Sequence, residues 1–134
     1  MSKLIHSVHH IAIIASDYAK SKNFYNQILG FEIINEAYRE QRASYKLDLR
    51  VDDTTQIELF SFPNPPMRPS TPEARGLRHL AFRVLNLDLV IEHLLLQSIE
   101  CEPIRIDEFT NRRFTFFKDP DGLPLELYEI SENQ

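Results

Sequence analysis

The sequence predicts an α+β fold built from two tandem modules, each with the element order β-α-β-β-β. Three observations support it. A proline-rich connector divides the chain into halves of similar length, each half has an apolar strand followed by a helix and three extended segments, and histidine and glutamate recur at corresponding places. The 134 residues are about the length of one domain. We therefore expect a single domain over residues 1–134, with module one at 5–62, a connector at 63–76 and module two at 77–131.

Proline identifies the connector. Five of the eight prolines lie in Pro63–Pro72. Proline lacks a backbone N–H and disfavours helix in the residue before it, so this stretch continues neither a helix nor a central strand. Because a module of about 60 residues buries too little apolar area to be secure alone, we expect the two modules to pair.

Module one begins with an apolar strand candidate, Val8–Ala15. Asp17–Leu29 follows with large apolar residues at helical spacing, and Gly30 is placed to cap the end of this helix. Three extended segments, separated by charged or polar turns, complete the module. These segments are Phe31–Arg39, Ala43–Val51 and Thr55–Phe62.

Module two repeats this order. The apolar strand candidate Leu77–Leu85 leads into Leu87–Gln97, where apolar residues recur at intervals of three and four. Asp119–Gly122 has the composition of a tight turn. The three extended segments are Glu102–Ile106, Arg112–Lys118 and Pro124–Ile130.

The composition excludes several classes of protein. Charged residues make up 26% and hydrophobic residues 43%, which is typical of globular chains and not of disordered ones. The net charge of −5 lacks the basic surplus of nucleic-acid-binding proteins, so we expect no nucleic-acid partner. No apolar run approaches the ~18–20 residues that span a bilayer, and no secretory signal is apparent, so we expect no membrane contact and a cytoplasmic location. Cys101 is the only cysteine, which excludes an internal disulfide and a thiolate metal cage.

Four potential metal ligands repeat with nearly one period. His79 follows His10 by 69 residues, and Glu126 follows Glu58 by 68 residues. Since side chains alternate along a strand, the apolar neighbours of each residue take one face and leave the four ligands on a common opposite face. Two imidazoles and two carboxylates suit a borderline divalent cation such as Ni²⁺, Zn²⁺, Co²⁺, Fe²⁺ or Mn²⁺, with positions left for water or substrate.

Each of these residues also has a simpler interpretation. A single histidine among apolar neighbours is more often structural, and a single glutamate on a strand is usually solvated. The repetition of both residue types is what favours a metal site. His6, His9 and His93 do not repeat, and we interpret them as structural or surface residues.

At these positions the sequence resembles the vicinal oxygen chelate superfamily, which includes glyoxalase I, bleomycin-resistance proteins and extradiol dioxygenases. The resemblance covers nearly the whole chain and is greatest to small bacterial glyoxalase I-like proteins. It implies that the two βαβββ modules form a curved sheet around a metal cleft. The matching segments, in order, are His9–Ile13, Asp17, Phe24–Tyr25, Leu29–Phe31, Ile57–Leu59, Arg78–Phe82, Asp119–Gly122 and Leu125–Leu127.

The resemblance implies a metal-dependent lyase or isomerase of the glyoxalase I type, similar to lactoylglutathione lyase. Such an enzyme transfers a proton next to a carbonyl that is bound to the metal, here one Ni, Zn, Co, Fe or Mn ion per site. Bacterial glyoxalase I uses two histidines and two glutamates, the set that Glu58 would complete. Glu126 is then the better candidate for the base, while Glu58 stays a ligand or acts on the opposite face of the substrate. The family also implies a homodimer, in which a site can draw ligands from both chains.

Three residues bear on the substrate, which we expect to be a small carbonyl compound. Where glyoxalase I commonly has an arginine and an asparagine that hold glutathione, this chain has Ile14 and Phe62, and neither side chain offers a donor. Arg75 does match an arginine found in some glyoxalase I sequences. We therefore expect a more apolar cleft, with Ile14 and Phe62 facing it from strand positions four residues after His10 and Glu58.

Other functions remain open at this point. The same superfamily contains metal-dependent epimerases, which use similar chemistry, and Fe(II) dioxygenases, which generally use two histidines and one glutamate. A third alternative is a non-catalytic protein that binds a small ligand. Relatives of that kind usually lack the metal ligands, so the complete set of four argues against it.

Overall fold

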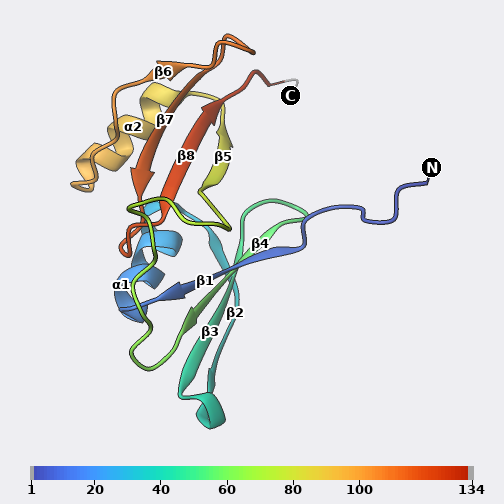
Figure 1. Cartoon of the computed structure of the whole chain (residues 1–134), viewed down its shortest axis with the longest axis vertical. Helices are drawn as coiled ribbons and strands as arrows, with labels where there is room; N and C mark the ends of the chain where they lie inside the picture. The colour runs from blue at the N-terminus through green and yellow to red at the C-terminus, as the bar shows by residue number, and fades with distance from the viewer. Residues whose placement is uncertain (1, 133–134) are drawn as a thin grey trace. The chain divides into compact units, whose positions relative to one another are not determined.

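Each half of the chain forms a four-stranded mixed sheet, and the two sheets share one strand order (Figure 1). The computed structural model describes residues 2–132 and divides into unit 1, Met1–Pro66, and unit 2, Met67–Gln134. The order is β1-β4-β3-β2 in unit 1 and β5-β8-β7-β6 in unit 2. In both sheets the first strand pairs in parallel with the last, and the other neighbours are antiparallel. The predicted α+β fold with two tandem modules is confirmed.

Unit 1 follows the predicted element order. Its helical segment begins at the N-cap Asp17, whose carboxylate accepts a hydrogen bond from the Lys20 N–H at 3.1 Å. The segment ends before Gly30, whose φ of +81° is a conformation that glycine adopts without strain. The elements are β1 His10–Ala15, α1 Tyr18–Lys22, the π-helix η1 Asn23–Ile28, β2 Glu32–Arg39, the 3₁₀-helix η2 Glu40–Arg42, β3 Ser44–Arg50 and β4 Gln56–Ser61.

Unit 2 repeats this arrangement with one longer helix. Asn86 caps that helix by accepting a hydrogen bond from the Leu89 N–H at 3.1 Å. In the predicted turn, the buried Asp119 carboxylate accepts from the N–H groups of Asp121 and Leu123, both at 2.9 Å. The elements are β5 Leu80–Val84, α2 Leu87–Leu96, β6 Arg105–Ile106, β7 Arg113–Lys118 and β8 Pro124–Glu129.

Two strands of unit 2 are shorter than the sequence predicts. His79, expected within the first strand of module two, lies one residue before β5. The parallel register starts at Leu80 opposite Leu125, so the preceding residue, His79, would face Pro124, which has no N–H to donate. β6 starts at Arg105 because Pro103 interrupts the ladder, although the Glu102 N–H still bonds to the Phe116 carbonyl at 2.9 Å.

One face of each sheet is buried, and the helix of the same unit lies against that sheet. α1 lies against β4 and α2 against β8. We call these the helix faces, and the opposite faces the ligand faces. The buried apolar residues of unit 1 are Ile13, Ala15, Phe24, Tyr25, Leu47, Leu49, Ile57 and Leu59, and those of unit 2 are Leu87, Leu94, Phe117, Leu123, Leu125 and Leu127.

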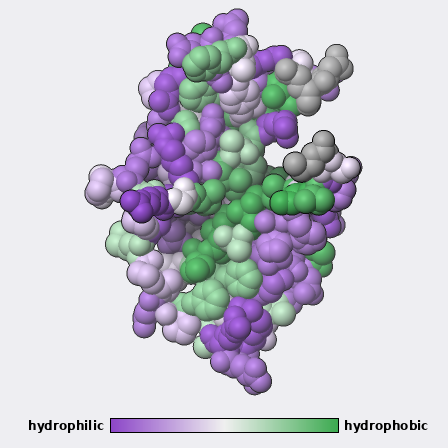
Figure 2. All heavy atoms as spheres, turned by 45° about the vertical axis from the view of Figure 1, so that its right-hand side comes forward, coloured by the Kyte–Doolittle hydropathy of each residue, from purple (hydrophilic) through white to green (hydrophobic). Residues whose placement is uncertain are grey.

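Hydrophobic side chains also reach the surface, as the green spheres in Figure 2 show. Leu4, Ile5 and Val8, before β1, are mostly exposed, and so are Leu89 and Leu96 on α2. Within residues 2–132, no helix is both long and apolar enough to cross a membrane.

Candidate metal ligands and substrate face

The structure places the first predicted ligand pair on the ligand face of unit 1. Glu58 lies in β4 between two fully buried residues, Ile57 and Leu59, so its side chain points to the opposite face. His10 begins β1, which pairs in parallel with β4, and its Nδ1 lies 3.5 Å from Oε2 of Glu58. His9, for which we expected a structural or surface role, contacts this pair, with its Nδ1 2.9 Å from Nδ1 of His10.

The second pair forms in the same way in unit 2. Glu126 lies in β8 between the buried residues Leu125 and Leu127. Its Oε1 lies 3.0 Å from Nε2 of His79, and this carboxylate side chain is 13% exposed. The His79 ring also packs edge-on against Phe116, with 5.0 Å between ring centroids.

Strand register shows that the two pairs are structurally equivalent. Glu58 lies opposite Ala12, two residues after His10, and Glu126 lies opposite Ala81, two residues after His79. The repeat inferred from sequence spacing is thus a repeat of position in the sheet.

The surroundings of the two glutamates differ. Asp48 lies directly across the antiparallel ladder from Glu58, and Lys46 bridges the two acids, with Nζ 2.6 Å from Oδ1 of Asp48 and 3.7 Å from Oε1 of Glu58. The residue across from Glu126 is Phe116. Among the described residues, His79 is the only basic side chain within ion-pair distance of Glu126.

Each pair has donor types that a divalent cation binds, at a spacing close to that of two ligands on one cation. Two ligands about 2.1 Å from one cation, in tetrahedral or octahedral geometry, lie roughly 3.0–3.4 Å apart. The observed separations are 3.5 Å for His10–Glu58 and 3.0 Å for His79–Glu126. Residues 2–132 contain no group of three or more His, Cys, Asp or Glu side chains arranged to hold a metal ion. The convergence of all four residues on one metal therefore stays a prediction.

The predicted substrate residues lie in different settings. Ile14 shares strand parity with His10 and is 51% exposed, whereas its neighbours Ile13 and Ala15 are buried. Phe62 follows β4 and stacks on Phe60, with ring centroids 5.9 Å apart. Arg75 lies exposed in the segment before β5.

The sequence analysis missed Arg39. This residue ends β2 and pairs with Ser44 across the turn, and its guanidinium lies 5.0 Å from the Phe60 ring centroid and 5.9 Å from that of Phe62. A donor therefore occupies the region that Ile14 and Phe62 alone would make apolar. Arg39 could have been found by predicting how the two strands of this hairpin pair. Its pairing with Ser44 fixes the face of the sheet on which Arg39 lies.

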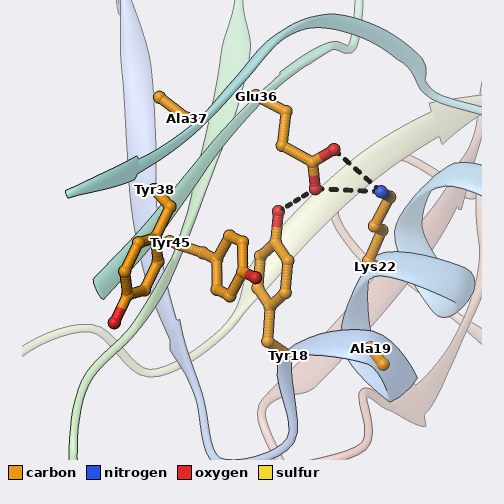
Figure 3. Close-up of a pocket in the computed structure, with 7 residues that line it drawn as sticks. All are labelled: Tyr18, Ala19, Lys22, Glu36, Ala37, Tyr38 and Tyr45. Carbon is orange, nitrogen blue, oxygen red and sulfur yellow. Dashed lines mark hydrogen bonds and ion pairs between the residues drawn. The ribbon is translucent and has the colours of Figure 1, made fainter. Parts of the chain in front are cut away.

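A shallow hollow of about 660 Å³ lies on the helix face of unit 1, away from the ligand pair (Figure 3). Its strand residues share parity with the buried Leu47, because Glu36 pairs with Leu47 and Tyr38 pairs with Tyr45. None of the predicted site residues lines it. The lining residues are Tyr18, Ala19, Lys22, Glu36, Ala37, Tyr38 and Tyr45.

The polar groups of this hollow bind one another. The Tyr18 hydroxyl donates to Oε2 of Glu36 at 2.5 Å, and Lys22 Nζ contacts both oxygens of Glu36 at 2.9 Å (Figure 3). Burial is the main cause that raises the pKa of Tyr18, and the hydrogen bond to Glu36 is the second. The same hydrogen bond lowers the pKa of Glu36. Tyr18 also stacks on Tyr45 at 4.4 Å. The contacts tie α1 to β2 and β3, so we interpret the hollow as a structural feature.

Comparison with known proteins agrees with this fold. The model of the Glyoxalase/Bleomycin resistance protein/Dioxygenase superfamily matches residues 7–127. The Bacillus subtilis protein named "Uncharacterized protein YwkD" is 62% identical over 126 residues, which covers 94% of this chain and 98% of that protein. The crystal structure of a glyoxalase family protein from Enterococcus faecalis has a TM-score of 0.88 at 50% identity, covering 95% of this chain and all of that chain. A 2-epi-5-epi-valiolone epimerase from Actinomyces sp. is 26% identical over 145 residues, 92% of this chain and 79% of that enzyme.

The chain belongs to the glyoxalase, bleomycin resistance protein and dioxygenase superfamily.

Proposed function

We propose that this protein is a metal-dependent lyase or isomerase of the glyoxalase I type, acting on a small carbonyl compound. His10, Glu58, His79 and Glu126 would hold one divalent ion, Ni, Zn, Co, Fe or Mn, with one pair from each unit of the same chain or of two chains in a dimer. The proposal rests mainly on the two equivalent histidine–glutamate pairs, whose separations of 3.5 and 3.0 Å are close to those of ligands sharing a cation.

When bound, the cation would stabilise the charge that develops on the substrate oxygens as a neighbouring C–H bond breaks. The chain's own residues would move the proton. We assign Glu126 as the base that takes the proton on a carboxylate oxygen and returns it to the adjacent carbon. Phe116 lies across from Glu126, and no lysine or arginine of the described residues binds that carboxylate, so it can turn toward a substrate. Glu58, held by Lys46 at 3.7 Å, is better suited to stay a ligand.

Epimerisation is the second candidate. It uses the same removal and return of a proton next to a carbonyl, and the relative named as an epimerase supports it. A lyase or isomerase of the glyoxalase type moves the proton to the adjacent carbon and so converts a thiol adduct of methylglyoxal into a thioester. An epimerase returns the proton to the carbon it came from and changes only the configuration of that carbon.

We also propose a cytoplasmic homodimer. The exposed Leu4, Ile5 and Val8 before β1, and Leu89 and Leu96 on α2, are large apolar side chains that a second chain could cover.

The test is proton exchange followed by NMR in D₂O. The protein is loaded with Ni²⁺ or Zn²⁺ and supplied with methylglyoxal adducts of 2-mercaptoethanol and of glutathione. We expect a lactoyl thioester carrying solvent deuterium from the 2-mercaptoethanol adduct. Glu126→Gln should lower the rate at least about a hundredfold, because it removes the base. Glu92→Gln, on the exposed side of α2, is the matched control and should leave the rate unchanged.

Two results would contradict the proposal. The first is the absence of exchange for every carbonyl compound tested while O₂ is consumed, which would indicate a dioxygenase. The second is an undiminished rate in Glu126→Gln, which would remove Glu126 from the chemistry.

A further inference from the structure

Arg39 is held on the ligand face of unit 1 with part of its hydrogen-bonding capacity unused. Its Nη2 donates to the hydroxyl of the fully buried Ser44 at 3.0 Å, which fixes the guanidinium in place. Its Nε is buried and has no hydrogen-bond partner, and no carboxylate among residues 2–132 forms an ion pair with it. Its Nη1 also forms no hydrogen bond with the described residues and, unlike Nε, is not buried, so Nη1 can donate to an acceptor from outside the chain.

The aromatic residues beneath Arg39 connect it to the proposed metal ligand. Phe60 and Phe62 follow Glu58 by two and four residues and share its side of the strand. At about 3.3 Å per residue they lie roughly 7 and 13 Å along the strand from Glu58. The guanidinium is in contact distance of both rings, at 5.0 and 5.9 Å, so it lies at the far end of the same face.

Unit 2 contains a comparable arginine whose charge is already compensated. Arg105 lies 5.2 Å from the Phe114 ring and 5.4 Å from the Phe116 ring. Its Nη2, however, is 3.1 Å from a carboxylate oxygen of Glu102. The two units therefore share an arginine placed over two phenylalanines, and only in unit 1 is it left without an acid.

We propose that Arg39 forms a carboxylate-binding subsite, which recognises a carboxylate at the end of the substrate remote from the reacting carbonyl. Phe60 and Phe62 form the floor beneath the apolar part of that substrate. A planar guanidinium with free N–H groups matches the two oxygens of a carboxylate, which lysine does less well. The assignment of this anion to the substrate depends on the proposed function, whereas anion binding by Arg39 does not.

The test uses a probe without a carbonyl group next to its carboxylate. Binding of 3-phenylpropanoate to the full-length protein is measured by isothermal titration calorimetry, with 3-phenylpropanamide as the uncharged comparison. We expect the carboxylate to bind more tightly than the amide. Arg39→Gln should raise the Kd of the carboxylate by about tenfold or more and leave that of the amide within about twofold. Arg39→Lys, which keeps the charge, should have a smaller effect.

Two further variants separate this subsite from the metal. Arg105→Gln is the matched control and should not change the Kd of the carboxylate. His79→Ala tests whether the probe binds a metal ion instead, and binding should persist in this variant. The proposal is overturned if wild-type protein binds acid and amide equally or binds neither, if Arg39→Gln binds the acid as wild type does, or if His79→Ala alone abolishes binding. Because the probe undergoes no proton transfer, a failure of the proposed catalytic function would leave this result intact.

Discussion

Glu129 joins helix α2 to the sheet that carries the proposed base. It lies in β8, three residues after Glu126. Its carboxylate accepts hydrogen bonds from the Leu87 N–H at the start of α2 and from Nε and Nη2 of Arg113, all at 2.9 Å. Replacing Glu129 by alanine removes all three bonds and leaves the Leu87 N–H without this acceptor.

The expected loss of stability follows from these contacts. A hydrogen bond to a charged group contributes about 1.5–3 kcal/mol when shielded from water, but exposed ion pairs contribute only about 0–1 kcal/mol. The Glu129 side chain is 22% exposed and that of Arg113 is 36% exposed. The hydrogen bonds between them are therefore only partly shielded, and we use the lower end of the range for shielded bonds, about 1.5 kcal/mol. An anion at a helix N-terminus adds about 0.3–1 kcal/mol. We expect Glu129→Ala to lower the free energy of unfolding by about 2 kcal/mol.

The pKa of Glu129 determines how this loss of stability depends on pH. The hydrogen bonds from Arg113 and then from Leu87 lower the pKa of Glu129 in the folded protein below its ordinary value of 4.5. The contribution of Glu129 is therefore complete above pH 4.5 and is lost as the pH falls through the lower, folded-state pKa. Urea unfolding at pH 7 and at pH 3 measures it. The difference between wild type and Glu129→Ala should shrink at the lower pH.

A matched control isolates the role of these contacts. Glu92→Ala removes an exposed glutamate from the same helix, and we expect its stability to stay within about 0.5 kcal/mol of wild type. The account of Glu129 would be refuted if Glu129→Ala behaved like this control at pH 7. It would also be refuted if the loss were the same at both pH values.

Three more predictions concern the site and its surroundings. Lys46→Met should lower the free energy of unfolding by about 1 kcal/mol in metal-free protein, because Asp48 and Glu58 then face each other without the ammonium between them; unchanged urea unfolding would contradict this. Burial raises the pKa of the Cys101 thiol, so iodoacetamide should alkylate it at least about tenfold more slowly than free cysteine at pH 7.5, and rapid labelling would disprove this. The glutathione hemithioacetal of methylglyoxal should be a poor substrate, since Arg39 can hold one carboxylate and Lys46 is already paired with Asp48. A kcat/KM above about 10⁵ M⁻¹s⁻¹ would show otherwise.

The fold could be predicted almost completely because hydrophobic periodicity and turn chemistry agree along this chain. Strand β3, for example, begins and ends within one residue of the predicted Ala43–Val51. The largest errors in strand bounds lie where proline removes a ladder donor, at the start of β5 and at β6. Such effects depend on which residues face each other, and this register cannot be read from one strand alone. The first strand also starts two residues later than the predicted Val8, and the predicted helix Asp17–Leu29 becomes a π-helix from Asn23.

The equivalent sheet positions of the four proposed ligands could also be predicted, because a repeated fold places repeated residues at equivalent strand positions, whereas their convergence on one metal stays a prediction. Sequence spacing did not reveal what surrounds them. Lys46 and Asp48 reach Glu58 from the neighbouring strand, and Arg39 reaches Phe60 across the sheet. Long side chains from β2 and β3 thus determine the polarity of this face. Their contribution depends on hairpin register and side-chain direction more than on any motif.

Metal stoichiometry tests the central claim most directly. Purified protein is stripped of metal, equilibrated with Zn²⁺ or Ni²⁺, dialysed and measured by inductively coupled plasma mass spectrometry. Wild type should retain one ion per chain, and His10→Ala, Glu58→Gln, His79→Ala and Glu126→Gln should each weaken retention by at least about tenfold. His93→Ala, on α2, should retain metal like wild type. If wild type binds no ion, or if the variants of only one unit lose it, the four residues do not form a shared metal centre.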